Sequence, residues 1–377
     1  MLRLAQILGI AIGMIAAVLL LGSIQSSPTL KRPPAAMLSE CDGAIRQIVI
    51  QYTQGADQVL PVYREFLPML PRDITVNVVR PDAGAFDELQ ASLPKTTCTL
   101  HPIFTNHPMT AWSRDRWVAL QAPIPGDPIT LLAPHNENGA ETWPARQGDQ
   151  IIAFDIARAL SPAVVASRSS LEFDGGDLLC DGENIFVTSA VLHRNLNRSV
   201  ASRDELIHTL EGTLHRPIIL MDNSPDHHAG MYMMAAVDHT MLIADPSLAK
   251  DSLPTDAPIL QTLPGGPDFS AETQHRLDFI ADQCRTLGYY VVRIPTIPGT
   301  DHKTYLTYVN VITDVRAGHR IVYMPIYRGA EKLNTAAEQV WKDIGYEVKR
   351  IDCTSTYRCF GNLHCLVNVL NRVAGEK

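Results

Sequence analysis

Residues 361–366 read GNLHCL and bring the thiol of Cys365 to the point where a polar loop meets an apolar run. Two other polar segments lie far upstream: residues 173–177 read FDGGD, and residues 228–232 read HAGMY. Together these segments supply a thiol, two carboxylates and an imidazole from widely separated parts of the chain. Nucleophilic cysteine enzymes have this organisation, because the fold gathers groups that the sequence keeps apart. The pattern therefore indicates an enzyme whose nucleophile is Cys365.

Cys365 is expected at the junction between a loop and a helix that spans residues 363–373. Backbone N–H groups at the start of a helix favour an anion and lower the pKa of a thiol. Gly361 permits a close backbone approach, and His364 is adjacent. A buried structural cysteine in an apolar helix is the alternative interpretation of the same residues.

The FDGGD segment places Asp174 and Asp177 on either side of a Gly-Gly turn, which can direct an acid into a cleft without crowding. A plain β-turn with solvated carboxylates is the alternative. His228 enters an apolar stretch and suits general acid–base catalysis if a carboxylate orients its ring. His227 and His228 could instead bind a metal, but no carboxylate or cysteine completes a known spacing, so we expect none.

Residues 112–117 read WSRDRW and place charged side chains between two tryptophans. Trp112 and Asp115 are suited to a pocket for a planar cation, through the ring face and one negative charge. A surface salt bridge between Arg114 and Asp115 is the alternative.

Short apolar segments bounded by Pro, Gly or Asp recur along the chain and predict strands. They span residues 45–52, 74–79, 117–121, 129–133, 185–188, 218–221, 241–244, 289–294, 308–312, 321–325 and 346–351. Apolar residues spaced three and four apart predict helices at residues 147–160, 202–210, 271–287, 334–344 and 363–373. Gly288 and Gly345 follow two of these helices directly, as helix stops do. The interleaving predicts an α/β protein with one large domain.

The net charge of −8, without any block of Lys or Arg, argues against nucleic acid or an anionic membrane surface as a partner. Arg3 precedes an apolar run from residue 7 to residue 21, and the next charge is Lys31. We therefore expect residues 1–27 to be a signal peptide or membrane anchor and residues 28–40 a linker. The catalytic domain is then residues 41–377, either exported to the periplasm or extracellular space or anchored to the membrane.

Seven cysteines permit disulfides if the domain is exported. The odd number leaves at least one thiol unpaired, and Cys365 is the expected one. Cys353 and Cys359 are close enough in sequence to pair. The spacing of these three cysteines matches no common zinc motif.

These segments, in this order, resemble the guanidino-group-modifying enzymes of the pentein fold, which include agmatine, peptidylarginine and arginine deiminases and dimethylarginine hydrolases. The WSRD and GNLHC segments are similar to those of agmatine deiminases, and FDGGD is similar to the acid-Gly-Gly segment of the superfamily. The resemblance spans roughly residues 45–377. It implies a five-bladed α/β propeller of ββαβ modules around a central site, and no cofactor.

The resemblance also implies a covalent mechanism. Cys365 attacks the guanidinium carbon, and His228 protonates the departing amine and then activates water to hydrolyse the thiouronium intermediate. Asp174 orients His228, and Asp115 holds the guanidinium. Carboxylates suit this task, because paired acceptors bind a planar cation best. The same segments give Trp112, Arg114 and Asp177 as further expected substrate-binding residues.

The segment starting at His228 departs from the family pattern. Most deiminases carry His-x-Asp there, and this chain has Gly230 in place of the acid. Dimethylarginine hydrolases also lack that acid, and Asp226 or Asp177 could compensate. The resemblance therefore implies a hydrolase acting on a small or peptide guanidino substrate of the agmatine, arginine or peptidyl-arginine type.

Three alternatives stay open. An amidinotransferase uses the same cysteine but passes the amidino group to another amine. A pentein-fold protein that binds guanidino ligands without turnover is suggested by Gly230. A disulfide-stabilised secreted α/β domain would make the motifs coincidental.

Overall fold

The computed structural model describes residues 33–137, 143–250, 252–254 and 257–373. The segment 1–27, expected to be a signal peptide or membrane anchor, lies outside these ranges. Among the described residues, no helix is long and apolar enough to cross a membrane.

The chain divides into an N-terminal unit of residues 1–34 and a main unit of residues 35–377. Residues 35–40, which the sequence analysis places in a linker, belong to the main unit. The reason is that Ala36 and Met37 form a strand of a sheet, and the side chain of Glu40 is buried.

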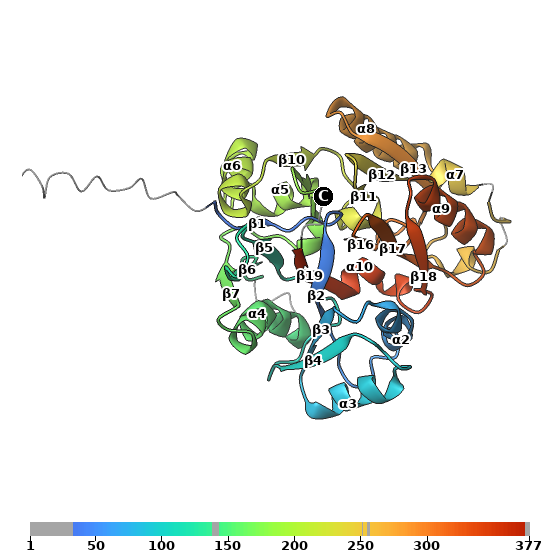
Figure 1. Ribbon diagram of the computed structural model, residues 1–377. Coiled ribbons are helices and arrows are strands. Elements are labelled where there is room, and N and C mark those ends of the chain that lie inside the picture. Colours follow the sequence, from blue (N-terminus) through green and yellow to red (C-terminus); the bar gives the residue numbers. More distant parts are fainter. Residues whose placement is uncertain (1–32, 138–142, 251, 255–256, 374–377) are drawn as a thin grey trace, which may run out of the picture. The chain divides into compact units, whose positions relative to one another are not determined.

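Five of the six sheets among the described residues share one plan, and the sixth is the two-stranded pair of β14 (Ile297–Pro298) and β15 (Tyr305–Leu306) (Figure 1). In each of the five, two antiparallel strands are followed by a helical segment and a further strand that is parallel to the second. This ββαβ repeat confirms the predicted α/β class and agrees with the pentein plan.

The first module contains β1 (Ala36–Met37), β5 (Val118–Gln121), β6 (Ile129–Ala133), α4 (Pro144–Ala159) and β7 (Val164–Arg168). The second contains β8 (Leu178–Cys180), β9 (Ile185–Thr188), α5 (Ser189–Asn195), α6 (Arg203–Leu214) and β10 (Ile218–Met221). The third contains β11 (Met233–Ala236), β12 (Thr240–Asp245), α7 (Pro246–Lys250), α8 (Ala271–Thr286) and β13 (Tyr290–Pro295).

The fourth module contains β16 (Ile312–Arg316), β17 (His319–Ile326), α9 (Glu331–Asp343) and β18 (Glu347–Asp352). The fifth contains β19 (Val367–Val373), β2 (Ala44–Gln51), α2 (Leu60–Met69), β3 (Thr75–Arg80), α3 (Ala83–Ser92) and β4 (Thr99–Phe104). The remaining short elements are β14 (Ile297–Pro298), β15 (Tyr305–Leu306), α10 (Leu363–Leu366), η1 (Gly175–Asp177), η2 (Ala229–Met231), η3 (Leu260–Thr262) and η4 (Tyr357–Cys359).

The fifth module joins two distant parts of the sequence. Strand β19 pairs antiparallel with β2, from Val367 opposite Ile50 to Val373 opposite Ala44, and the two lie side by side in Figure 1. Strand β19 also contacts β5, and β16 contacts β2. This pairing holds α10, and with it Cys365, against the first and fourth modules.

Helix stops follow the expected chemistry. Gly288 and Gly345 end α8 and α9 with φ angles of 91° and 87°, a conformation that favours glycine. Ser202 and Ser270 begin α6 and α8 by accepting hydrogen bonds from backbone N–H groups three residues later.

Two predicted elements are wrong. The helix expected at residues 363–373 is a single turn, α10, followed by strand β19, because β2 offers its free edge and the valines favour a strand. The strand expected at residues 308–312 begins only at Ile312. In the preceding segment, backbone groups form hydrogen bonds with side chains: the Thr307 N–H donates to the Tyr327 hydroxyl, and the Tyr308 carbonyl accepts from the Trp341 ring N–H.

Candidate active site

Each module places one polar residue in the segment just before its buried first strand. In chain order these residues are Asp115 before β5, Asp174 before β8, His228 before β11, Asn310 before β16 and Cys365 before β19. Because the repeat brings the starts of these strands together, five distant segments meet at one site. Four of the five were predicted from the sequence, and Asn310 was not.

The thiol of Cys365 is buried, with 3% of the residue exposed. Its Sγ lies 3.4 Å from Nδ2 of Asn310, which donates to it, and its carbonyl accepts from the Arg114 N–H at 3.2 Å. A Cβ added at Gly361 would lie 2.6 Å from the ring of Trp112 and 3.1 Å from Cβ of Cys365. Only glycine therefore fits at position 361, between the ring of Trp112 and the side chain of Cys365, which explains why the GNLHC segment begins with glycine.

His228 links the thiol to an acid. Its Nε2 lies 3.8 Å from Oδ2 of Asp174. Burial alone would lower the pKa of His228, but its polar contacts with Asp174 and the Cys365 thiol raise that pKa well above its usual range. These contacts therefore favour the cationic form of the imidazole, next to the thiol.

Gly176 sets the position of the His228 ring. A Cβ at residue 176 would lie 2.4 Å from Nδ1 and 2.5 Å from Cγ of His228. The Gly-Gly turn thus serves to admit the imidazole as well as to direct the acid. His227, by contrast, turns its Nε2 to the carbonyl of Phe360 at 3.0 Å, and burial lowers its pKa to about 3.

Asp174 and Asp115 form the acidic side of the site. Burial raises the pKa of Asp174, but His228 and Arg146 more than offset this and hold it well below its usual range. Burial raises the pKa of Asp115, and Arg146 and His228 offset only part of that rise. Asp174 is therefore firmly ionised, whereas the charge of Asp115 depends on a cation beside it.

Two of the expected substrate-binding side chains turn elsewhere. Asp177 accepts from the Asp174 N–H at 2.7 Å and pairs with Arg194, so it stabilises the turn that holds Asp174. Arg114 is buried and pairs with Glu40, also donating to Asn368 at 3.2 Å. Trp112 remains beside the thiol through its contact with Gly361.

Glu40 also contacts His364, with 3.1 Å between Oε2 and Nε2. Burial raises the pKa of Glu40, but Arg114 and His364 more than offset this and lower it to about 2. Burial lowers the pKa of His364. The buried ion pair of Glu40 and Arg114 thus holds His364, the residue next to the nucleophile, in place. No sequence motif indicates this pair.

Gly230 faces the neighbours of the thiol. A Cβ at residue 230 would lie 2.9 Å from Nδ1 of His364 and 3.4 Å from Nδ2 of Asn310. Asn310 also donates to the Gly230 carbonyl at 3.2 Å and accepts from the His364 N–H at 2.9 Å. Position 230 is therefore adjacent to two polar side chains and contributes no carboxylate. Asp226 is exposed.

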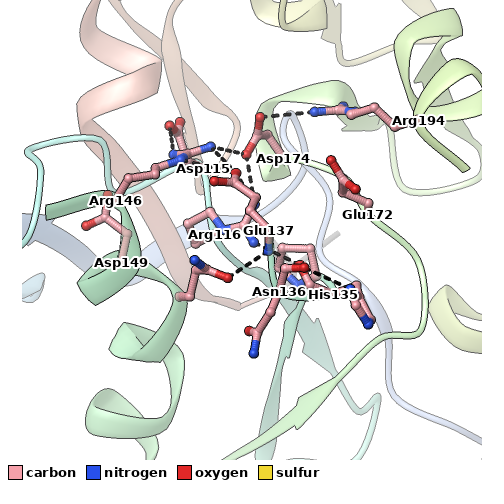
Figure 2. A network of polar contacts seen from close by, with 12 residues as sticks. Asp115, Arg116, His135, Asn136, Glu137, Arg146, Asp149, Glu172, Asp174 and Arg194 are labelled. Atoms are coloured by element: carbon pink, nitrogen blue, oxygen red, sulfur yellow. Dashed lines mark hydrogen bonds and ion pairs between the residues drawn. The ribbon is translucent and has the colours of Figure 1, made fainter. Parts of the chain in front are cut away.

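A network of carboxylates and arginines lies next to Asp115 and Asp174 (Figure 2). Nη1 of Arg146 lies 2.6 Å from Asp115, and its Nη2 lies 2.6 Å from Asp174 and 3.1 Å from Glu137. Arg116 bridges Glu137 and Asp174 at 2.9 Å and 3.3 Å. Neither Glu137 nor Arg146 lies in a recognisable motif, so sequence patterns could not place them here.

The cysteines other than Cys365 contribute no group to the candidate active site. All seven lie within the described ranges and are free thiols, including Cys353 and Cys359, and six of the seven are buried. Burial raises the pKa of Cys41 and of Cys180 to about 12, which makes these thiols unreactive. No group of three or more His, Cys, Asp or Glu side chains in the described part of the chain is arranged to hold a metal ion.

Known proteins share this fold. An agmatine deiminase from C. jejuni aligns with 90% of this chain and 97% of its own, with 14% sequence identity and a TM-score of 0.66. An agmatine deiminase of Enterococcus faecalis aligns with 90% and 96%, again with 14% identity and a TM-score of 0.61. No curated protein sequence matches the chain. A family model matches residues 49–369, and the chain therefore belongs to the Porphyromonas-type peptidyl-arginine deiminase family.

Proposed function

We propose that the protein is a hydrolase of guanidino groups that acts through a covalent intermediate on Cys365. The observation that carries this proposal is the position of the His228 imidazole, 3.8 Å from Asp174 and beside the Cys365 thiol. An imidazolium beside a thiol stabilises the thiolate, which is the form that attacks carbon. The family membership and the fold shared with agmatine deiminases support the same class of substrate.

The proposed reaction has two halves. In the first, the Cys365 thiolate forms a bond to the guanidinium carbon, and the C–N bond to the leaving amine breaks as His228 gives that nitrogen its proton. In the second, neutral His228 takes a proton from water, the hydroxide bonds to the same carbon, and the C–S bond breaks. The hydroxyl group left on that carbon loses its proton to solvent as the carbonyl forms. The products are a ureido compound and ammonium or a protonated amine, and thiolate and imidazolium are restored.

Acids and a donor would position the substrate in this scheme. Asp174 keeps His228 protonated for the first half, and Asp115 faces the cation. The Nδ2 of Asn310, 3.4 Å from Sγ, stabilises negative charge on the thiolate. The carboxylate of Asp115 would therefore bind the substrate cation, and the amide of Asn310 would stabilise the anionic nucleophile.

Cysteine labelling tests the proposal. The purified full-length protein would be treated with a haloacetamidine and the modified residue mapped by mass spectrometry, alongside assays for ureido product with agmatine, arginine and an arginine peptide. Selective labelling of Cys365 over Cys359 is expected, although Cys359 is the more exposed thiol. Cys365→Ser should abolish turnover, and Cys359→Ser should leave it unchanged. Full turnover by Cys365→Ser would refute the assignment.

Gly230 favours one other function, the binding of guanidino ligands without turnover. The missing acid leaves the cation with fewer carboxylates than in most family members. This alternative predicts ligand binding without labelling of Cys365 and without ureido product, so the same experiment separates the two. An added acceptor amine distinguishes hydrolysis from amidino transfer, because only transfer consumes the acceptor.

We also propose that the enzyme is exported or anchored to a membrane. Arg3 and the apolar run from residue 7 to residue 21 support this location. Fractionation of cells expressing the full chain, compared with a form lacking residues 1–27, tests it. Equal recovery of both forms from the cytosol would contradict the proposal.

A further inference from the structure

The guanidinium of Arg146 lies where a cationic substrate is expected to bind. Its two terminal nitrogens contact Asp115 and Asp174, each at 2.6 Å, and its Nε lies 3.3 Å from Glu137 (Figure 2). A planar cation gripped by carboxylates on two edges is the arrangement that a substrate guanidinium requires.

The two acids that hold Arg146 also adjoin the reacting groups. Asp115 follows Arg114, whose N–H donates to the Cys365 carbonyl at 3.2 Å. Asp174 contacts His228 at 3.8 Å. Asp115 and His228 also interact electrostatically, so the Arg146 guanidinium bridges two acids that both act on the general acid–base.

Helix α4 is fixed so that Arg146 faces this site. The Asp149 carboxylate accepts from the N–H and the hydroxyl of Thr110, at 2.9 Å and 2.6 Å, which ties the helix to the segment leading to Trp112. A Cβ at Gly148 would lie 1.7 Å from the carbonyl oxygen of Pro108, so the helix start packs directly on that segment. The backbone of Arg146 cannot be moved away without breaking these contacts.

The helix dipole does not favour a cation at this point. Arg146 lies in the first turn of α4, where the dipole disfavours positive charge and where the turn has no acidic residue. The carboxylates of the site, rather than the helix, therefore hold the guanidinium.

The acids at the guanidinium site are already paired without a substrate. Asp115, Glu137, Asp174 and Asp177 pair with Arg116, Arg146, Arg194 and His228. While Arg146 holds Asp115 and Asp174, a substrate guanidinium finds neither carboxylate free. Without Arg146, the same cluster would lack one positive charge, and the pKa of Asp115 would be higher until another cation arrived.

We propose that Arg146 is a built-in occupant of the guanidinium site: a substrate binds by displacing the Arg146 side chain from Asp115 and Asp174. This inference rests on the proposed function for the identity of the site. A guanidino ligand can bind only while Arg146 is away from the two acids. The apparent Kd of every such ligand is therefore its intrinsic Kd divided by the fraction of molecules in which Arg146 is away. This competition therefore acts on KM and binding, whereas kcat changes little.

The matched variants lie on one helix. Arg146→Gln removes the occupant, and Arg158→Gln removes an arginine of α4 that is 74% exposed and pairs with Asp155. Both are made in the Cys365→Ser full-length protein, so that binding is measured without turnover. Isothermal titration uses ethylguanidinium as the probe and ethylammonium as the control ligand.

Arg146→Gln should bind ethylguanidinium roughly tenfold or more tightly than the protein with Arg146 intact, and Arg158→Gln should bind it unchanged. Arg146→Lys covers the case in which Arg146→Gln does not fold. It keeps the charge but lacks the planar, rigid fork of donors that spans the two carboxylates, so it should also tighten binding. Unchanged or weaker binding by a folded Arg146 variant would overturn the inference.

The outcome is separable from the proposed function. Tighter binding by the Arg146 variants, together with no hydrolysis by any form that retains Cys365, would support the occupant and reject the hydrolase. Hydrolysis by the unsubstituted protein, with a KM that Arg146→Gln does not lower, would support the hydrolase and reject the occupant.

Discussion

Replacing Glu40 with Gln tests the buried ion pair behind the nucleophile. The carboxylate of Glu40 pairs with Arg114 and lies 3.1 Å from Nε2 of His364. Gln keeps the shape of the Glu40 side chain and one acceptor oxygen but removes its charge. The buried Arg114 guanidinium then has only neutral acceptors, which include Asn368 and the Leu178 carbonyl. Breaking a buried pair from one side costs about 3–5 kcal/mol.

The pKa of Glu40 gives an independent magnitude. It falls from the usual 4.5 to about 2 in the folded protein. At about 1.4 kcal/mol for each pH unit, that difference corresponds to about 3 kcal/mol of the free energy of unfolding. Because the folded pKa is depressed, this stabilisation is fully present above pH 4.5 and disappears as the pH falls toward 2.

Urea unfolding, followed by circular dichroism from pH 7 down to pH 3, measures both quantities. Glu40→Gln should lower the free energy of unfolding by about 3 kcal/mol at pH 7, and the difference should shrink below pH 4.5. Glu272→Gln is the matched control, because its side chain is 82% exposed and its loss should cost little. A loss for Glu40→Gln below about 1 kcal/mol at pH 7, or an equal loss at pH 3, would refute the assigned role of the pair.

Three further changes probe the site. Gly176→Ala places a Cβ 2.4 Å from His228 Nδ1 and should lower kcat by roughly 100-fold in a ureido assay, whereas Gly212→Ala, which meets nothing within 4 Å, should not; equal rates would contradict the assigned ring position. Asp174→Asn removes the main support of the His228 cation, so the alkaline limb of the pH–rate profile should move to lower pH, and an unmoved limb would exclude this role. Asn310→Ala should lower the free energy of unfolding by about 1–3 kcal/mol in urea, because Asn310 is fully buried and its partners lose their hydrogen bonds; an unchanged midpoint would argue against these bonds.

The sequence predicted those parts of the fold that depend on local pattern. Strands expected at residues 129–133, 185–188 and 218–221 agree with β6, β9 and β10 residue for residue, because each is a short apolar run with clear limits. The segment 363–373 was mistaken for a helix, since its apolar residues also recur at helical spacing. Only the pairing with β2, distant in the sequence, decides in favour of a strand.

The site was predicted where chemistry requires a particular residue type. Cys365, His228, Asp174 and Asp115 lie together as the motifs indicated. Arg114 was assigned to the substrate from its place beside Asp115, yet consecutive side chains leave the backbone in different directions, and Arg114 turns to the interior.

Several partners fall in segments without any motif. Glu40 lies in the expected linker, and Arg146 and Glu137 lie at the start of a helix and in the loop before it. Asn310 had one available signal: every other module has a polar residue just before its first strand. Recognition of the fivefold repeat in the sequence would have led to it.

The pairing of β19 with β2 also governs when the thiol becomes competent during folding. This contact closes a loop that contains the other four modules, and closing so long a loop is slow because of its entropy. Until it forms, Cys365 cannot reach Asn310 and His228, even if those modules are already folded. The time at which Cys365 becomes selectively labelled during refolding would therefore report when β19 pairs with β2. Intermediates that have native helices but lack this pairing would show no turnover.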